Sequence, residues 1–328
     1  MSTRRLQPAD LSTIPIPWWR NRRLLPWLVQ AVVGLAVLVV VAFLVSNLVR
    51  NLSKAGLLLS FGWLDNPSGF DIAETLLPFD AGMPYWRALA AGLVNTIRVV
   101  LAGLVGSSVL GLVVGSAAFS SNGLLRRLAR IYVELIRNIP LLLQLVFWYF
   151  VVFLALPNGS QAIQLPGFVL AKSGLYLGAA ELVNGVWQAP IRFSVEFGAL
   201  LTGLVVYTGA FIAEVVRGGV ASVPRGQWEA ARSLGFSKVQ TLRHIILPQA
   251  LRVIVPGLNS QYISLAKNSS LAVACGYTDL YSVAETTLNQ TGRAVEVVLI
   301  LLGAYLVIDL LISALMNGMN QLVQLKER

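Results

Sequence analysis

Few residues in this chain could carry out catalysis. The 328 residues include one cysteine, Cys275, and one histidine, His244, so an internal disulfide is excluded and a His/Cys metal site is not expected. The sequence lacks a Gly-x4-Gly-Lys-Ser/Thr phosphate loop, a Gly-x-Ser-x-Gly elbow and a His-Glu-x-x-His pair. We therefore expect no catalytic residues, no bound metal or cofactor, and no ATP hydrolysis through a phosphate loop of this chain.

Arg98 and a cluster of four polar residues interrupt apolar stretches of the sequence. A charge inside such a stretch is costly and usually faces a cavity or a partner. Arg98 could therefore bind a substrate carboxylate, or it could extend to the interface or bond to a neighbouring helix. The cluster comprises Lys267, Asn268, Ser269 and Ser270. Because consecutive residues point all around a helix, some can line a substrate path while others bond between helices.

Two pairs of opposite charges have the spacing of neighbours on one helix face. Glu134 precedes Arg137 by three residues, and Glu214 precedes Arg217 by three. Both are predicted to be structural ion pairs, whereas Asp309 has no such partner in the sequence. Close helix packing is predicted at the small residues Gly103, Gly106, Gly111 and Gly115.

Membrane-spanning helices must position these residues. Hydrophobic residues make up 56% of the chain and charged residues only 12%. Residues 24–49, 99–125 and 138–171 contain no charged residue, and each run exceeds the ~20 residues that a helix needs to cross the hydrocarbon. Because no water satisfies backbone groups at that depth, the spans must be helical. The predicted fold is an all-α integral membrane bundle.

About six transmembrane helices are predicted. Their approximate bounds are 27–49, 88–118, 131–156, 195–217, 250–275 and 295–320. The first follows several arginines, but its length and the lack of an Ala-x-Ala site favour a retained anchor over a cleaved signal peptide. Residues 157–193 are predicted to form an outer loop apolar enough to lie against the membrane or a partner. A seventh, re-entrant segment is the alternative there.

The charges are distributed unequally between the predicted sides. With the N-terminus inside, the inner segments hold 16 basic and 4 acidic residues, and the outer segments hold 6 basic and 9 acidic residues. This is the positive-inside bias of membrane proteins. It places both termini in the cytoplasm, and it explains the net charge of +10 without nucleic acid as a partner.

The longest inner loop, 217–248, contains a short helical pattern that ends near Gly235. Such a helix could dock a partner or form a plain basic surface loop. The loop fits the spacing EAA-x3-G-x9-I-x-LP at Glu229, Ala230, Ala231, Gly235, Ile245, Leu247 and Pro248. This pattern resembles the signature loop of bacterial ABC importer permeases. Residues 132–144 and 213–228 resemble the polar amino acid permeases in particular, and the likeness covers roughly residues 88–320.

The resemblance implies a type I ABC importer permease bundle in the bacterial inner membrane. Its implied partners are a dimer of ATPase subunits that binds ATP and Mg, a second permease copy or paralogue, an extracytoplasmic amino acid-binding protein, and lipid. The signature loop would then couple the ATPase to the transmembrane helices. Permeases with an additional N-terminal helix form a subset of this family.

The expected domain organisation follows from the same pattern. Residues 1–26 form a cytoplasmic segment, 27–87 an extra helix and outer loop, 88–320 the permease domain, and 321–328 a cytoplasmic tail. Two alternatives stay open at this point. One is a permease for another small solute, such as a peptide or an inorganic anion, and the other is a membrane scaffold without transport.

Overall fold

The computed structural model describes residues 24–54 and 59–324, and the chain divides into two compact units at residue 60. The described part of the first unit includes the helix α1 (Leu24–Lys54). Its apolar side chains are exposed on every side, as Leu38, Val39 and Phe43 illustrate. A helix that is hydrophobic all round suits lipid. The expected segments 1–26 and 321–328 lie largely outside the described residues.

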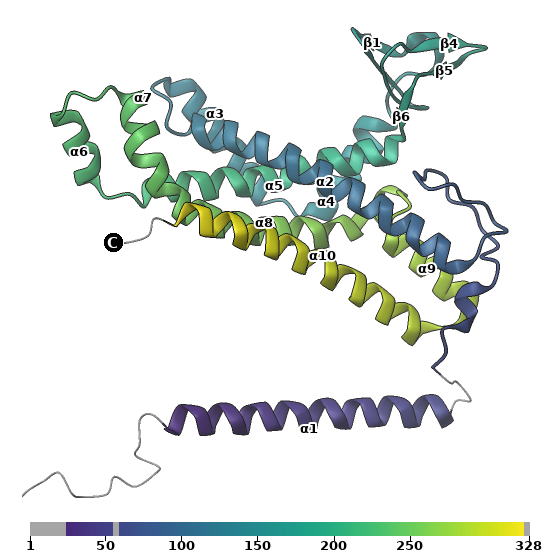
Figure 1. Ribbon diagram of the computed structural model, residues 1–328. Helices are drawn as coiled ribbons and strands as arrows, with labels where there is room; N and C mark the ends of the chain where they lie inside the picture. Colours follow the sequence, from purple (N-terminus) through teal and green to yellow (C-terminus); the bar gives the residue numbers. More distant parts are fainter. Residues whose placement is uncertain (1–23, 55–58, 325–328) are drawn as a thin grey trace, which may run out of the picture. The chain divides into compact units, whose positions relative to one another are not determined.

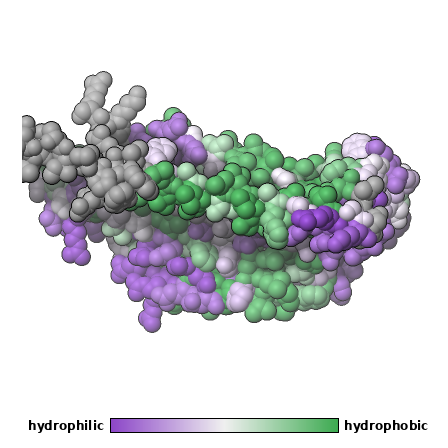
Figure 2. All heavy atoms as spheres, turned by 90° about the horizontal axis from the view of Figure 1, so that it is seen from below, coloured by the Kyte–Doolittle hydropathy of each residue, from purple (hydrophilic) through white to green (hydrophobic). Residues whose placement is uncertain are grey.

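Four long helices form the body of the second unit (Figure 1). They are α2 (Tyr85–Ala117), α5 (Val195–Ala221), α8 (Leu247–Asn268) and α10 (Ala294–Val323). α5 packs against α2 and α8, and α8 packs against α10. On the face that Figure 2 draws, hydrophobic residues cover the middle and hydrophilic residues lie toward the two ends. This distribution matches a protein that spans a bilayer.

Glycines allow α2 and α5 to approach each other closely, as the sequence predicts. A Cβ atom on Gly111 would lie 2.9 Å from the carbonyl oxygen of Gly209, and one on Gly115 would lie 2.8 Å from the Val216 side chain. Larger residues at these two positions would push the helices apart. The predicted packing role of these glycines is therefore confirmed.

Two of the six predicted transmembrane helices have a different form in the structure. Among the described residues, four helices are long and apolar enough to cross a membrane: α1, α2, α5 and α10. The predicted span 131–156 is instead broken, because α3 (Gly123–Arg137) meets α4 (Leu141–Val146) and the π-helical turn η4 (Phe147–Phe153) at a bend of 105°. Pro140 explains the break, since the residue before a proline disfavours helical backbone. Counting this bent pair as one span gives five.

The predicted span 250–275 also differs in the structure. α8 ends at Asn268, and the chain continues as the 3₁₀ helix η7 (Ser269–Cys275). Polar residues spread along α8, among them Gln249, Arg252, Asn259 and Lys267, make this helix less apolar than the four spans named above. α8 is nevertheless part of the bundle, between α5 and α10.

Short strands replace the predicted apolar outer loop, and no re-entrant helix forms within residues 157–193. β1 (Ile163–Leu165), β2 (Phe168–Ala171), β3 (Gly174–Leu177) and β6 (Ile191–Phe193) form an antiparallel sheet in that order. β4 (Glu181–Val183) and β5 (Val186–Gln188) form a hairpin. A small core stabilises this β-lobe and contains Ala162, Val169, Ala171, Tyr176 and Trp187.

Connecting elements gather at the two ends of the second unit (Figure 1). One end carries α6 (Arg225–Ser233) and α7 (Lys238–Thr241), and α10 finishes at the same end. The opposite end carries the β-lobe, α9 (Leu280–Thr291) and the 3₁₀ turn η3 (Gly62–Asp65). The bundle therefore separates the signature loop from the β-lobe.

Candidate functional site

The helix α6 carries the Glu-Ala-Ala part of the signature. Ala231 is fully buried, whereas Glu229 and Ala230 are exposed. Trp228 packs with Val220 and other apolar residues at the ends of α5 and α8. One face of α6 is thus fixed to the bundle, and the other presents Glu229 and Ala230 to the surroundings.

Gly235 ends α6 in a left-handed conformation, with φ of 80°. The amide of Gly235 donates to the carbonyl of Arg232, and that of Phe236 donates to the carbonyl of Ala231, which together make a Schellman motif. Glycine suits this position because other residues are strained at positive φ. The chain then reverses into α7, whose N-cap Ser237 forms a capping box with Gln240.

The Ile-x-Leu-Pro part of the signature leads back into the bundle. Ile245 lies in the π-helical turn η6 (Leu242–Ile246), next to the fully buried Ile246. Leu247 and Pro248 begin α8, and a proline in the first turn of a helix removes no hydrogen bond. Across the α6–α7 connection, Leu234 is 75% exposed and Val239 is 74% exposed. The loop thus combines a rigid attachment with an exposed apolar surface that suits protein docking.

The side chain of Arg98 already has a partner in the protein. Its Nη1 atom lies 2.5 Å from Glu74 Oε1, and its guanidinium carbon lies 4.7 Å from the ring centre of Phe193 and 4.4 Å from that of Phe197. Glu74 Oε2 also accepts a hydrogen bond from the backbone amide of Ser194 at 2.9 Å. Arg98 thereby joins α2 to the segment before it and to the start of α5, and a substrate carboxylate would have to displace Glu74.

The polar cluster at the end of α8 mainly bonds within the protein. Lys267 Nζ lies 3.4 Å from Asp309 Oδ2 on α10, which supplies the partner that the sequence does not reveal. The hydroxyl of Ser269 donates to the carbonyl of Ala266, and that of Ser270 donates to the carbonyl of Lys267. Arg98 borders a cavity of about 320 Å³ that none of residues 267–270 lines. The structure therefore does not bring the two predicted substrate groups into that cavity.

One predicted ion pair is present and the other is replaced. Arg217 binds both carboxylate oxygens of Glu214, at 2.5 and 2.8 Å. Arg137 extends across to α5 instead of pairing with Glu134, so that it lies 3.9 Å from Glu214 Oε1 and over the ring of Phe211. The prediction of a Glu134–Arg137 pair is wrong because it considered only one helix, whereas α5 offers Arg137 both a carboxylate and an aromatic face.

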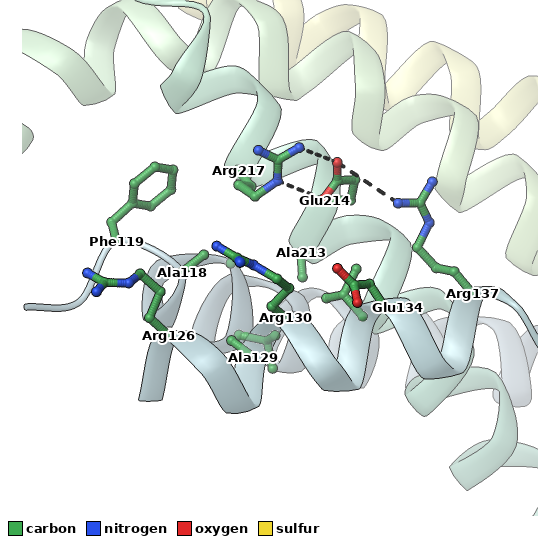
Figure 3. Close-up of a pocket in the computed structure, with 13 residues that line it drawn as sticks. Ala118, Phe119, Arg126, Ala129, Arg130, Glu134, Arg137, Ala213, Glu214 and Arg217 are labelled. Atoms are coloured by element: carbon green, nitrogen blue, oxygen red, sulfur yellow. Dashed lines mark hydrogen bonds and ion pairs between the residues drawn. The ribbon is translucent and has the colours of Figure 1, made fainter. Parts of the chain in front are cut away.

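A cavity of about 550 Å³ lies between the end of α2, α3 and α5 (Figure 3). Four arginines and two glutamates line it: Arg126, Arg130, Arg137, Arg217, Glu134 and Glu214. The sequence analysis did not single out Arg126 or Arg130. Their spacing contained a signal, because residues 126, 130, 134 and 137 share one face of a helix.

Asp279, which the sequence analysis also missed, is a buried carboxylic acid at the start of α9. Its Oδ1 accepts hydrogen bonds from the backbone amide and hydroxyl of Ser282, at 2.9 and 3.0 Å, and Tyr305 lies 3.3 Å from Oδ2. Burial raises the pKa of Asp279 to about 6, although the Ser282 bonds oppose the rise. The residue caps a helix within a nearly dry environment.

Comparison with known proteins identifies the family. Residues 107–324 match the family described as binding-protein-dependent transport system inner membrane component. The chain belongs to this family. It is accordingly a multi-pass permease of the inner membrane, and the signature loop of this permease lies within the matched region.

Curated relatives extend the similarity over almost the whole permease. The putative amino-acid ABC transporter permease protein YhdX of Escherichia coli is 38% identical, over 92% of this chain and 95% of its own length. The general L-amino acid transport system permease protein AapQ of Rhizobium johnstonii is 34% identical, over 86% and 88%. The solved structure described as an amino acid ABC transporter with histidines matches with a TM-score of 0.56 and 26% identity, over 72% of this chain and 94% of that one.

Proposed function

We propose that this permease carries polar amino acids across the bacterial inner membrane. The observation that supports the substrate class is the near full-length similarity to permeases described as amino-acid transport proteins. A chain of this kind contributes the membrane path. ATP hydrolysis then occurs on a separate pair of ATPase subunits that hold ATP and Mg, and an extracytoplasmic binding protein delivers the substrate. A second copy or paralogue of the permease completes the path.

The α6–α7 segment is the proposed contact with the ATPase. Its exposed residues include Leu234 and Val239, while Ala231 and Ile246 anchor it to the bundle. A push on the exposed surface would reach α5 and α8 directly, because both helices share one apolar cluster with this segment. This arrangement supports a coupling role for the seven signature residues at 229–231, 235, 245, 247 and 248.

The proposed orientation places both termini in the cytoplasm. The end of α10 lies on the same side of the bundle as α6 and α7 (Figure 1), which is where an ATPase would dock. The excess of basic residues in the inner segments supports the same orientation. The β-lobe and α9 then face the binding protein.

The substrate path is proposed to use Asn268 before the other predicted residues. Among the described residues, the half-buried Asn268 side chain forms no hydrogen bond, whereas the side chains of Lys267, Ser269 and Ser270 are engaged within the protein. A zwitterionic substrate needs hydrogen bonds or opposite charge to enter a low-dielectric path. Arg98 can contribute only in a state in which it has left Glu74.

Uptake by the reconstituted transporter tests this function. The permease, its ATPase, its partner permease and its binding protein are placed in proteoliposomes, and uptake of labelled amino acids, a dipeptide and phosphate is compared. We expect ATP-dependent uptake of the amino acids and no uptake of the dipeptide or phosphate. Uptake of the dipeptide or phosphate without amino acids would contradict the proposed substrate class.

The proposed role of Asn268 is tested in the same assay. Asn268→Ala should lower amino acid uptake more than Ser270→Ala does.

The coupling role has its own test. Gly235→Asp is expected to abolish uptake while the protein still inserts into the membrane. A side chain at φ of 80° is strained, and the new carboxylate would be desolvated at the proposed contact with the ATPase. Gly226→Asp is the matched control, since Gly226 has the same open space around it within this chain but no positive φ. Normal uptake and normal ATPase co-purification by the Gly235→Asp variant would rule out the coupling role.

A further inference from the structure

We propose that the arginine cavity between α2, α3 and α5 binds the phosphate group of an anionic membrane lipid. This inference does not depend on the transported substrate. It starts from the charges that line the cavity, four guanidinium groups against two carboxylates. The volume of about 550 Å³ lies within the range of ~300–1,000 Å³ that is usual for ligand sites.

The carboxylates in the cavity leave two of the arginines without an acidic partner. Glu214 binds Arg217 through both oxygens and also faces Arg137. Within residues 24–54 and 59–324, neither Arg126 nor Arg130 forms an ion pair. Arg126 donates one hydrogen bond, to the carbonyl of Ser120 at 3.2 Å.

The positions of the side chains concentrate positive charge in one part of the cavity. In Figure 3, Arg126 and Arg130 extend from α3 on the side near Ala118 and Phe119, while Glu134 and Arg137 lie toward the other end. Guanidinium groups present several N–H donors in a planar fork that matches phosphate oxygens. An anion held there would meet Arg126 and Arg130 before it met a carboxylate.

The other face of α3 indicates that the phosphate belongs to a lipid. Four apolar residues of this helix are at least half exposed: Leu124 at 65%, Leu128 at 52%, Ile131 at 50% and Leu135 at 58%. A helix with arginines on one face and exposed leucines on the other suits the boundary between headgroups and acyl chains. A soluble phosphate would need the arginines but not the leucines, so the combination favours a lipid.

The location of the cavity agrees with the same ligand. It lies at the end of α2 that leads into α3, on the side of the bundle where α6 and α7 are found. With the proposed orientation, this is the cytoplasmic leaflet, where anionic lipids attract basic residues and fill basic pockets between helices. Lipid binding here would fix α3, the first half of the broken span, against α5.

Native mass spectrometry of the full-length permease in detergent can test the proposal. Wild-type protein is incubated with phosphatidylglycerol or with phosphatidylcholine, and retained lipid is counted. Phosphatidylglycerol should be retained in preference, and Arg126→Gln/Arg130→Gln should weaken its binding about tenfold or more, because hydrogen bonds to charged groups are lost. Arg127→Gln is the matched control, since Arg127 neighbours both residues on α3 but does not line the cavity.

Further arms distinguish the sources of the anion and guard against misfolding. Arg126→Lys/Arg130→Lys keeps both charges without the planar fork, so it should bind phosphatidylglycerol with intermediate strength. A second measurement compares the melting temperature of the wild-type permease with each anion. Inorganic phosphate at matched ionic strength should raise this temperature less than phosphatidylglycerol does. Equal retention of both lipids, equal binding by the double Gln variant and the Arg127→Gln control, or an equal effect of inorganic phosphate would each overturn the proposal. Loss of the partner permease by the double Gln variant, with normal lipid retention, would also contradict the proposal, because the arginines would then serve the contact between permeases.

Discussion

Arg98 shows how one charge is accommodated within an apolar helix. Its guanidinium has a carboxylate at 2.5 Å and two phenylalanine rings against it, and the two charged side chains keep only 14% and 20% of their exposure. Charge neutralisation and contact with the aromatic rings together lower the cost of burial. The pair also ties residues 74, 98 and 194 together, so it fixes the outer segment to the bundle.

Arg98→Ala should therefore destabilise the permease. The expected loss is about 2 kcal/mol, which is below the cost of breaking a fully buried pair because both side chains retain some exposure. Thermal unfolding in detergent measures this loss. The double variant Glu74→Gln/Arg98→Met should lose less stability than Glu74→Gln and Arg98→Met lose together as single variants. Arg87→Ala on the same helix is the control. If Arg98→Ala keeps full stability but raises the amino acid concentration for half-maximal uptake, the side chain binds substrate instead.

Asp279 should make stability depend on pH. Its pKa is raised to about 6 in the folded protein, so the fold favours the protonated acid. The stabilisation is present below the unfolded pKa of ~3.9 and is lost as the pH rises toward 6. Asp279→Asn keeps a side-chain oxygen for the cap and removes the ionisation, so its melting temperature relative to wild type should increase between pH 4 and pH 7. A constant difference across that range would contradict the raised pKa.

The ion-pair partners of Arg98 and Lys267 were the part of the site that the sequence could not supply. Glu214 and Arg217 were predictable because one helix fixes their spacing. The partners of Arg98 and Lys267 come from residues 24 and 42 positions away, and no periodicity links such distant positions. The local structure of the signature residues was predictable by pattern, since the left-handed Gly235 and the capping Ser237 are encoded by the sequence itself.

At the scale of the elements, the contact between α2 and α5 has little room for change. The positions of Gly111 and Gly115 face backbone or side-chain atoms of α5 within 3.0 Å of where a Cβ atom would lie. The spacing of these glycines predicted this packing. The break between α3 and α4 was not predicted, because the expected span 131–156 was drawn through Pro140 on the strength of the apolar residues on both sides of it.

Gly111→Val should separate the two helices and destabilise the bundle by about 1–3 kcal/mol, which is the usual cost of overpacking a core. Gly303→Val is the control, because a Cβ atom at Gly303 on α10 meets no atom within 4 Å. Melting temperatures in detergent and the yield of folded protein give the comparison. Equal behaviour of the two variants would mean that α2 and α5 can move apart freely.

At the scale of the whole molecule, the second unit has a different construction at each end. The β-lobe has a core of its own, whereas the α6–α7 segment shares its core with α5 and α8. The sequence predicted the helical class correctly, and the ATPase contact at the α6–α7 end stays a prediction. It missed the β-lobe because its strands have three or four residues each, too few to produce a clear alternation within an apolar loop.

Reporter fusions check the proposed orientation of the molecule. A fusion at Gly69, in the segment before α2, should report the outer compartment, and one at Gly226, in α6, should report the cytoplasm. The reason is the excess of basic residues on the side of α6. A result that places both fusions in one compartment is incompatible with this topology.

The glycine-lined contact of α2 with α5 also has a mechanical consequence. Long side chains between two helices can change rotamer, and this allows one helix to shift without moving the other. At Gly111, α2 contributes no side chain to the contact, and α5 contributes the short, branched side chain of Ile212 and the carbonyl oxygen of Gly209. We therefore expect this contact to be stiff, so that a force applied at α6 would move α5 and α2 together.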